Sequence, residues 1–223
     1  LDFSKSDVKK GNFKYEYKTI DHVEYCRKVY DDGYSTAYTV GTLFDTLETA
    51  ETATEVNIVD QIDGIPVTEA GIEYQSNYED FSEMSCYGYI IDNSKEYYGS
   101  RYYSYSHDES KDVRIGANVE KVTIPDSIKR IPAECFANMK KLKTITLPKN
   151  LVSLGESAFS NCTSLESVIF KGNKLTVITK ETFYNCKSLK KVALNKSKVG
   201  FIGDRAFYNC KSLKNISLSS ALS

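Results

Sequence analysis

The sequence predicts an α/β, predominantly β, solenoid in which short parallel strands stack coil on coil behind an N-terminal β-hairpin cap. The first observation is a block at 158–165 that recurs almost unchanged at 182–189 and 206–213. The second is a constant step, because the phenylalanines of these blocks and of a weaker fourth copy lie 23, 24 and 24 residues apart, at Phe136, Phe159, Phe183 and Phe207. A period of about 20–50 residues indicates a solenoid or another repeat array.

Each repeat also contains one segment of pattern L-x-x-L-x-L, in which Ile, Val or Phe replaces some leucines, at 142–147, 165–170, 189–194 and 213–218. This pattern predicts one short strand per repeat. Each coil offers about seven apolar side chains, whose burial gains on the order of 10–20 kcal/mol. Backbone ordering costs about 1–2 kcal/mol per residue. A single coil is therefore unstable, and the repeats over 118–223 are expected to stack as one parallel array.

The N-terminal region, 1–52, is predicted to form a β-hairpin cap. After a polar lead-in over 1–12, aromatic and polar residues alternate over 13–17, as in a half-buried strand. The Asp-Asp-Gly sequence at 31–33 lies between two further strand-like runs. It predicts a hairpin, because Asp-Gly readily adopts the positive φ angles of a tight turn.

The middle region, 53–117, is predicted to hold irregular first repeats interrupted by an insertion. Strand-like runs occur at 54–58 and 62–68, and Phe81 and Met84 take the places of the repeated Phe and Cys. The preceding stretch at 42–52 carries apolar residues among Thr and Glu, which predicts a short helix there.

The repeats resemble the BspA-like, or Treponema pallidum type, leucine-rich repeats. The resemblance rests on the A-F-x-N-C-x-x-L block, on the Ile-Pro and Leu-Pro pairs at 124–125 and 147–148, and on the apolar-Gly pairs at 154–155 and 202–203. It is specific over 118–218 and looser over 53–117. It implies a right-handed horseshoe in a secreted or surface-anchored protein of bacteria or some protozoa, with the signal peptide removed. The function that it implies is adhesion to host or matrix proteins.

Composition argues against several classes of partner. The chain has 29 basic and 30 acidic residues and a net charge of -1, so no bulk electrostatic attraction to nucleic acid or to a membrane surface is expected. No run approaches the roughly 18 apolar residues of a membrane-spanning helix, so the chain is not expected to be embedded in a membrane. It opens without Met or a signal-peptide core and is interpreted as a mature or trimmed segment.

The cysteines predict a structural role. Cys162, Cys186 and Cys210 occupy one repeated position whose fourth occupant is Met139. Met cannot form a disulfide, so the position is expected to hold a soft apolar side chain, and the cysteines are expected to be free thiols in the core. A disulfide between Cys26 and Cys86, which lie outside this series, is left open.

No catalytic, cofactor or metal site is predicted. The two histidines, His22 and His107, lie in no nucleophile, acid–base or metal arrangement. The acidic pairs lack the regular spacing of oxygen ligands around calcium. Glycine-rich phosphate loops and G-x-S-x-G elbows are also missing from the sequence. The prediction is therefore a protein that is not an enzyme.

The insertion is the first candidate for binding a partner. Residues 74–105 hold nine of the 17 tyrosines, interleaved with Ser, Gly, Asn and Asp. Tyrosine provides large contact area at low rotamer entropy, and its small polar neighbours provide adaptable hydrogen bonds. The alternative is that the rings pack on the protein's own coils. The tyrosines predicted to anchor a partner are Tyr97, Tyr98, Tyr102, Tyr103 and Tyr105.

The second candidate is the outward face of the parallel strands, which we call the strand face. Its predicted contact residues are Thr144, Thr146, Lys191 and Asn215. The side chains of this face are small, mostly polar and slightly basic, which suits a flat protein contact better than a catalytic pocket. The alternative is a plain solvated sheet.

Together these features predict a non-enzymatic, secreted or cell-surface protein that binds another macromolecule. A host or matrix protein is the expected partner, and a carbohydrate is left open. Two other interpretations compete with this one: an enzyme with a site in the tyrosine-rich insertion, and a structural spacer within a larger surface protein.

Overall fold

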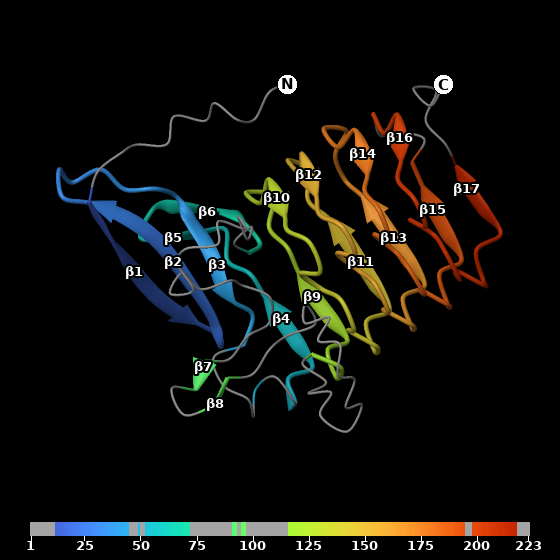
Figure 1. Ribbon diagram of the computed structural model, residues 1–223, viewed down its shortest axis with the longest axis horizontal. Coiled ribbons are helices and arrows are strands. Elements are labelled where there is room, and N and C mark those ends of the chain that lie inside the picture. The colour runs from blue at the N-terminus through green and yellow to red at the C-terminus, as the bar shows by residue number, and fades with distance from the viewer. Residues whose placement is uncertain are drawn as a thin grey trace.

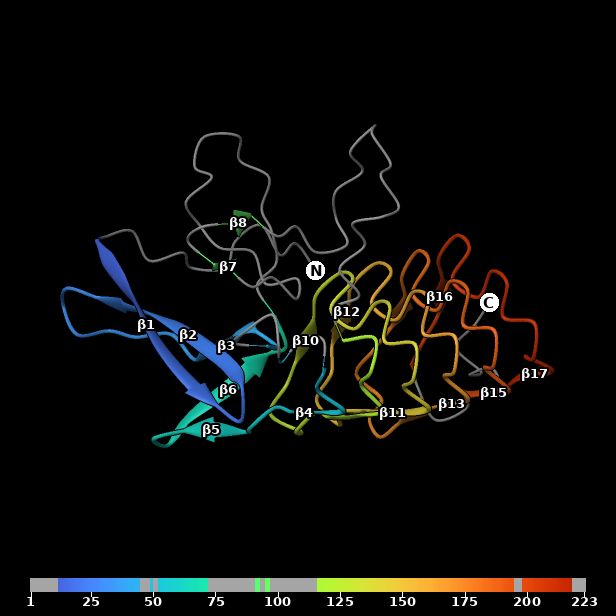
Figure 2. The ribbon, with the colours of Figure 1, turned by 90° about the horizontal axis from the view of Figure 1, so that it is seen from below.

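The computed structural model describes residues 12–44, 49, 52–71, 91–92, 95–96, 116–194 and 198–217. The described chain is an elongated, strand-rich molecule with an antiparallel sheet at its N-terminal end and a row of coils leading to its C-terminal end (Figure 1). A view turned by 90° shows the coils side by side along the long axis (Figure 2). The parallel array that the repeat predicts is therefore present, and its curvature into a right-handed horseshoe stays a prediction.

The N-terminal end begins with a long hairpin. Strand β1 (Phe13–Ile20) pairs antiparallel with β2 (Val23–Tyr30) over its whole length. The turn between them consists of Asp21 and His22, which both have positive φ, at 48° and 66°. Two such residues in succession match the twist of a hairpin. The sequence analysis missed this turn, because neither residue is glycine.

The predicted Asp-Asp-Gly turn is confirmed. It joins β2 to β3 (Tyr38–Thr42), and the two strands pair antiparallel. Gly33 has φ 84°, and its N–H donates to the Tyr30 carbonyl at 2.9 Å. The Asp32 carboxylate accepts the Tyr34 N–H at 3.1 Å. Gly33 therefore supplies the positive φ angle of the turn, and Asp32 supplies a side-chain acceptor for a backbone N–H two residues on.

The hairpin sheet continues into the repeats. Strand β3 pairs parallel with β6 (Ile65–Glu69), which pairs with β10 (Arg130–Ile131), which pairs with β12 (Ser153–Leu154). A short strand, β5 (Gln61–Ile62), pairs antiparallel with β6. Strands β14 (Val177–Ile178) and β16 (Phe201–Ile202) form the last parallel pair on this side of the stack.

A second set of parallel strands includes the four predicted from the L-x-x-L-x-L segments, together with a pair that precedes them in the chain. It contains β4 (Glu55–Asn57) paired with β9 (Lys121–Thr123), and the four-stranded sheet β11 (Thr144–Leu147), β13 (Ser167–Phe170), β15 (Lys191–Ala193) and β17 (Asn215–Ser217). Equivalent repeat positions lie directly opposite one another, as at Ile145 and Val168. Strands β7 (Ile91–Asp92) and β8 (Lys95–Glu96) form a small antiparallel pair within the segment 53–117.

The predicted α component is small in the described part of the chain. Of the segment 42–52, for which a helix is predicted, only Thr49 and Thr52 are described as helical, and much of the segment lies outside the described residues. The fold class is therefore β-rich, and the α/β description applies only weakly.

The repeated phenylalanines form the centre of the core. Phe136, Phe159 and Phe183 are fully buried, and successive rings from Phe136 to Phe207 stack nearly parallel with centroids 5.4 to 5.6 Å apart. This spacing is close to the distance of about 4.8 Å between paired strands. Each ring can therefore rest on the equivalent ring of the next coil.

The repeated cysteines fill the adjacent core position. Cys162 and Cys186 are fully buried free thiols, which confirms the packing prediction for these two, whereas Cys210 is a free thiol that is only half-buried. Each S–H also donates to the carbonyl of the preceding coil's phenylalanine, Cys162 to Phe136 at 3.1 Å and Cys186 to Phe159 at 3.2 Å. Where the position holds Cys, the thiol therefore serves as a hydrogen-bond donor as well as a soft apolar group.

The repeated asparagines shape the turns between coils. Asn138, Asn161, Asn185 and Asn209 all have φ between 58° and 64°. Their amides also form a ladder, in which Asn185 donates to Asn161 at 2.8 Å and Asn209 donates to Asn185 at 2.6 Å. Asparagine tolerates the left-handed conformation better than most residues. The left-handed turn and the side-chain ladder together explain why Asn recurs at this position.

Buried Tyr25 ties the hairpin to the stack. Its hydroxyl accepts the Val59 N–H at 3.0 Å and donates to the Asn57 carbonyl at 3.4 Å. Burial raises the pKa of Tyr25 to about 12. The ring is fully buried, so this residue joins two segments that lie more than 30 positions apart.

Gly155 allows two coils to approach closely. A Cβ at this residue would overlap the backbone atoms of Pro132 and Ala133 in the preceding coil. Backbone cannot move aside as a flexible side chain can, so Gly155→Ala is expected to lower the free energy of unfolding by about 1–3 kcal/mol. Urea denaturation measures this change. Ser153→Ala, an exposed change in the same coil, is the control and should stay within about 0.5 kcal/mol; equal stability of the two variants would contradict the close approach.

Candidate binding surfaces

The strand face has the composition that the sequence predicts. Thr144, Lys191 and Asn215 are exposed as the first residues of β11, β15 and β17, and Thr146 is half-buried. The Thr144 and Ser167 hydroxyls lie 3.2 Å apart and hydrogen-bond across the ladder. Parallel pairing brings these four predicted residues onto one surface, because they hold outward positions of strands in a single sheet.

One apolar side chain interrupts the strand face. Ile169 is 49% exposed at the outward position of β13, where it lies opposite Thr146 of β11. At the N-terminal end of the face, Lys121 of β9 pairs with Glu55 of β4 at 3.1 Å. The exposed part of the face is therefore polar with one exposed apolar residue.

The tyrosine site predicted in the insertion belongs to a part of the chain that the structure does not describe. Tyr97, Tyr98, Tyr102, Tyr103 and Tyr105 lie outside the described residues, as do Cys86 and His107. The relation of the insertion to the strand face therefore stays a prediction. Cys26 is a free, buried thiol.

An aromatic cluster on the hairpin is a surface that the sequence analysis did not single out. Rings from β1, β2 and the following turn contact one another with centroids 5.5 to 6.1 Å apart, at Phe13, Tyr15, Tyr17, Tyr30 and Tyr34. The Lys28 ammonium lies 4.2 Å from the centre of the Phe13 ring. Strand pairing creates this cluster, and the alternation of aromatic residues over 13–17 was its only sequence signal.

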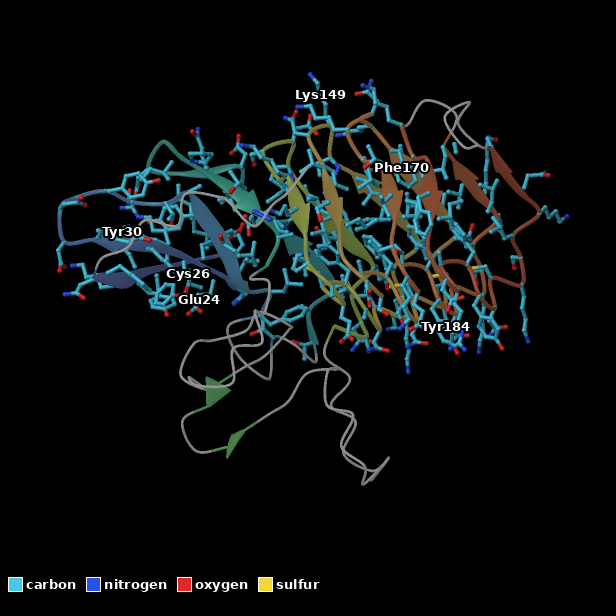
Figure 3. All side chains as sticks on the ribbon, turned by 45° about the horizontal axis from the view of Figure 1, so that its top comes forward. Glu24, Cys26, Tyr30, Lys149, Phe170 and Tyr184 are labelled. Carbon is cyan, nitrogen blue, oxygen red and sulfur yellow. The ribbon has the colours of Figure 1, made fainter. Side chains whose placement is uncertain are left out.

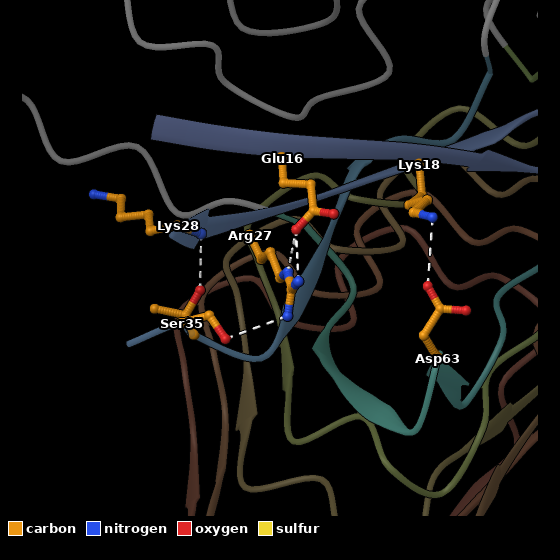
Figure 4. Close-up of polar contacts among 7 residues, drawn as sticks. Glu16, Lys18, Arg27, Lys28, Ser35 and Asp63 are labelled. Atoms are coloured by element: carbon orange, nitrogen blue, oxygen red, sulfur yellow. Dashed lines mark hydrogen bonds and ion pairs between the residues drawn. The ribbon is translucent and has the colours of Figure 1, made fainter. Parts of the chain in front are cut away.

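Polar contacts hold other residues of the same hairpin (Figure 4). Arg27 donates from Nε to Glu16 at 2.7 Å and from a terminal nitrogen to the Ser35 hydroxyl at 3.2 Å. The Arg27 guanidinium also lies 5.0 Å from the centre of the buried Tyr38 ring. Lys18 pairs with Asp63 at 3.4 Å. These groups already have partners within the protein, which favours a structural role.

The chemistry of the described residues offers no activated nucleophile among the core thiols. Burial raises the pKa of Cys162 from 9.0 to about 12, and it raises the pKa of Cys186 still further, with a smaller contribution from the neighbouring thiols. A reactive cysteine requires the opposite shift, because the thiolate is the nucleophile. Within the described ranges, His, Cys, Asp and Glu side chains form no group of three or more that could hold a metal ion.

Exposed aromatic residues occur at the turn next to the asparagine ladder. Tyr184 and Tyr208 stack with centroids 5.2 Å apart and planes 12° from parallel, and Tyr208 is 56% exposed. Both follow a core phenylalanine directly in the sequence. The sequence repeat predicted the phenylalanines as core residues, but it gave no prediction for these two tyrosines.

Comparison with protein families matches residues 115–223 to the BspA-type leucine-rich repeat region, in six copies. Comparison with curated protein sequences finds no match. None of the helices in the described part of the chain has the length and apolar character needed to span a membrane.

Several solved structures are similar to this chain. A leucine-rich repeat protein from Eubacterium ventriosum is 30% identical, with 48% of this chain and 28% of that chain covered and a TM-score of 0.45. The pneumococcal vaccine antigen PcpA is 21% identical, with 92% of this chain and 50% of that chain covered and a TM-score of 0.51. The leucine-rich repeat protein of T. pallidum is 18% identical, with 90% of this chain and 92% of that chain covered and a TM-score of 0.40.

The chain thus spans half or less of the length of the first two of these proteins. The likeness to PcpA shows a shared fold, which agrees with the stacked strands of β11, β13, β15 and β17. The resemblance seen in the A-F-x-N-C-x-x-L block is confirmed by the six matched copies. Residues 115–223 are a BspA-type leucine-rich repeat region.

Proposed function

We propose that this protein is a non-enzymatic binding module, secreted or displayed at a cell surface, that holds another macromolecule, with a host or matrix protein as the expected partner. The observation that carries the proposal is the strand face, a surface built from equivalent positions of successive coils. Such a surface grows with the number of coils and presents small polar groups at regular spacing. Repeat arrays use extended surfaces of this kind for binding.

The chemistry of the described residues supports the same proposal. The core thiols are protonated at neutral pH, since burial raises the pKa of Cys162 to about 12. The polar groups around Arg27 bind one another. The resemblance to BspA-like proteins supports a secreted or surface location for the chain, and the right-handed horseshoe that it implies would give the strand face a gentle curvature.

The tyrosine-rich insertion is the proposed anchor for the partner, and the strand face is the proposed flanking contact. Aromatic residues dominate the costly truncations at protein interfaces, whereas Thr and Ser are under-represented there. Simultaneous Ala replacement of Tyr98, Tyr102 and Tyr103 is therefore expected to weaken partner binding by about 2 kcal/mol or more. Replacement of Thr144 and Thr146 should change it by less than about 1 kcal/mol.

An array of extracellular-matrix and host surface proteins, probed with the full chain and then titrated at each positive spot, measures these effects. Thermal denaturation must first show that each variant remains folded. Normal binding by the folded tyrosine variant, combined with loss in the threonine variant, would move the anchor to the strand face. Absence of any binding protein would favour the structural spacer, and turnover in a hydrolase screen that His107→Ala abolishes would favour the enzyme.

A further inference from the structure

The net charge of -1 conceals two oppositely charged halves. Residues 116–223 contain 18 Lys and Arg but only 7 Asp and Glu, whereas residues 1–115 contain 11 Lys and Arg and 23 Asp and Glu. The repeat region is therefore strongly basic. A surface that carries charge of one sign attracts ligands of the opposite sign and raises their local concentration.

Much of this charge lies along one edge of the stack. The edge is formed by four equivalent eight-residue segments, 136–143, 159–166, 183–190 and 207–214, which follow one another from coil to coil. We call it the lysine edge. Its basic residues are all exposed, and they are Lys140, Lys141, Lys143, Lys187, Lys190, Lys211 and Lys214. Glu166 is the single acidic residue of the four segments.

Most of these ammonium groups are available to a ligand. Lys190 pairs with Glu166 at 2.6 Å, and this contact lowers the pKa of Glu166. In the described part of the chain, Lys190 is the only lysine of the edge that forms an ion pair. Parallel strand pairing separates equivalent positions of adjacent coils by about 4.8 Å. Lys187 and Lys211, like Lys190 and Lys214, therefore repeat at the step of the coils.

The lysine edge also carries groups suited to a sugar. The rings of Tyr184 and Tyr208 lie at the start of the segments and are partly or largely exposed. A phenol ring offers an apolar surface together with a hydroxyl group. Ser188 and Ser212 add hydroxyl groups beside the lysines. An extended ligand along this edge would thus meet cations, rings and hydroxyls in each of the last two coils.

We propose that the lysine edge binds a linear anionic polysaccharide, with Tyr184 and Tyr208 in contact with its sugar rings. The seven basic side chains are all lysines, whose ammonium groups act as point charges toward the anionic groups of such a chain. The choice of a polysaccharide over nucleic acid rests on the proposed extracellular location. Its residues differ from those of the tyrosine-rich insertion, for which a protein partner is proposed.

Heparin, a sulfated polysaccharide, is the probe, and its affinity for the full chain is measured by titration calorimetry at several salt concentrations. The test variant is Lys187→Gln, Lys211→Gln, Lys214→Gln. The matched control is Lys149→Gln, Lys171→Gln, Lys174→Gln, which removes the same charge. Lys149 lies at the edge of the stack opposite Tyr184 (Figure 3). All six lysines are exposed, so both variants are expected to fold.

We expect heparin to bind the parent more weakly as salt rises, because binding of a polyanion to lysines releases counterions. The test variant should lose roughly tenfold or more in affinity at low salt and show a shallower salt dependence. The control should lose less than about threefold. Tyr208→Ala should weaken heparin binding without changing the salt dependence, since the ring carries no charge.

Equal losses in the test and control variants would overturn the site, because only overall charge would then matter. Absence of heparin binding would also overturn it. Single-stranded DNA or poly-glutamate that binds as tightly as heparin would replace the polysaccharide by another polyanion. These outcomes are independent of the proposed protein partner, whose binding is measured on the tyrosine and threonine variants.

Discussion

Replacing Phe183 by Ala is expected to lower the free energy of unfolding by about 3–5 kcal/mol, the range for truncating a buried aromatic ring. The ring is fully buried and stacks between Phe159 and Phe207, at 5.6 Å and 5.4 Å. Its removal leaves a cavity and ends both stacking contacts. Urea denaturation followed by circular dichroism measures the change.

Phe201→Ala is the matched control for this prediction. It removes the same atoms from the next coil, but the Phe201 side chain is 60% exposed, so its free energy of unfolding should change by no more than about 0.5 kcal/mol. Because coils cover one another, the Phe183 variant should also lose hydrogen-exchange protection in the coils before and after it. A cost below 1 kcal/mol, or damage confined to one coil, would contradict the continuous core.

Raising the pH from 9 to 11 is expected to destabilise the protein by roughly 4–5 kcal/mol in total through Cys162 and Cys186 alone. Burial raises the pKa of Cys162 from 9.0 to about 12 and raises that of Cys186 further. Above pH 9 the unfolded thiols lose their protons while the folded thiols keep theirs. The unfolded state is thereby favoured, by about 1.4 kcal/mol per pH unit for each thiol. Well below pH 9 both states are protonated and the effect vanishes.

The double variant Cys162→Ser, Cys186→Ser separates this effect from other alkaline titrations. Serine keeps a donor for the Phe136 and Phe159 carbonyls but does not ionise in this range. Urea midpoints at pH 8 to 11 with a reductant should fall less steeply for the variant. Cys26, whose pKa burial also raises to about 12, supplies part of the remaining slope in both proteins. If the urea midpoint falls equally steeply with pH in the parent and in the variant, the two thiols ionise in the folded state.

The lysine edge could have been found from the sequence. The charges of the two halves can be counted in it, and the equivalent segments are aligned by the repeat. The net charge of the whole chain hid the difference, because an average over both halves cancels it. The two exposed tyrosines, Tyr184 and Tyr208, were likewise visible beside the core phenylalanines. The exposure of their rings could not be seen in the sequence, since it depends on which side of the coil each residue faces.

The sequence by itself determined the repeat region. A constant step, one apolar strand pattern per repeat and a recurring Phe, Asn and Cys were sufficient, because each local preference agrees with the same stack. It also determined which residues would form the strand face, since alternate strand positions point to opposite sides of a sheet. The Asp32-Gly33 turn was found for a similar reason, as its positive φ has a recognisable residue preference.

Only the tertiary structure decided how the repeat is joined to the rest of the chain. The Asp21-His22 turn, the β3–β6 pairing and the hydroxyl of Tyr25 connect the hairpin to the coils through contacts between distant segments. Such contacts have no local periodicity. It also decided that the repeated cysteines donate hydrogen bonds to carbonyls of the preceding coil. Their spacing in sequence shows that they are equivalent, but the atom that each thiol meets is set only when one coil lies on the next.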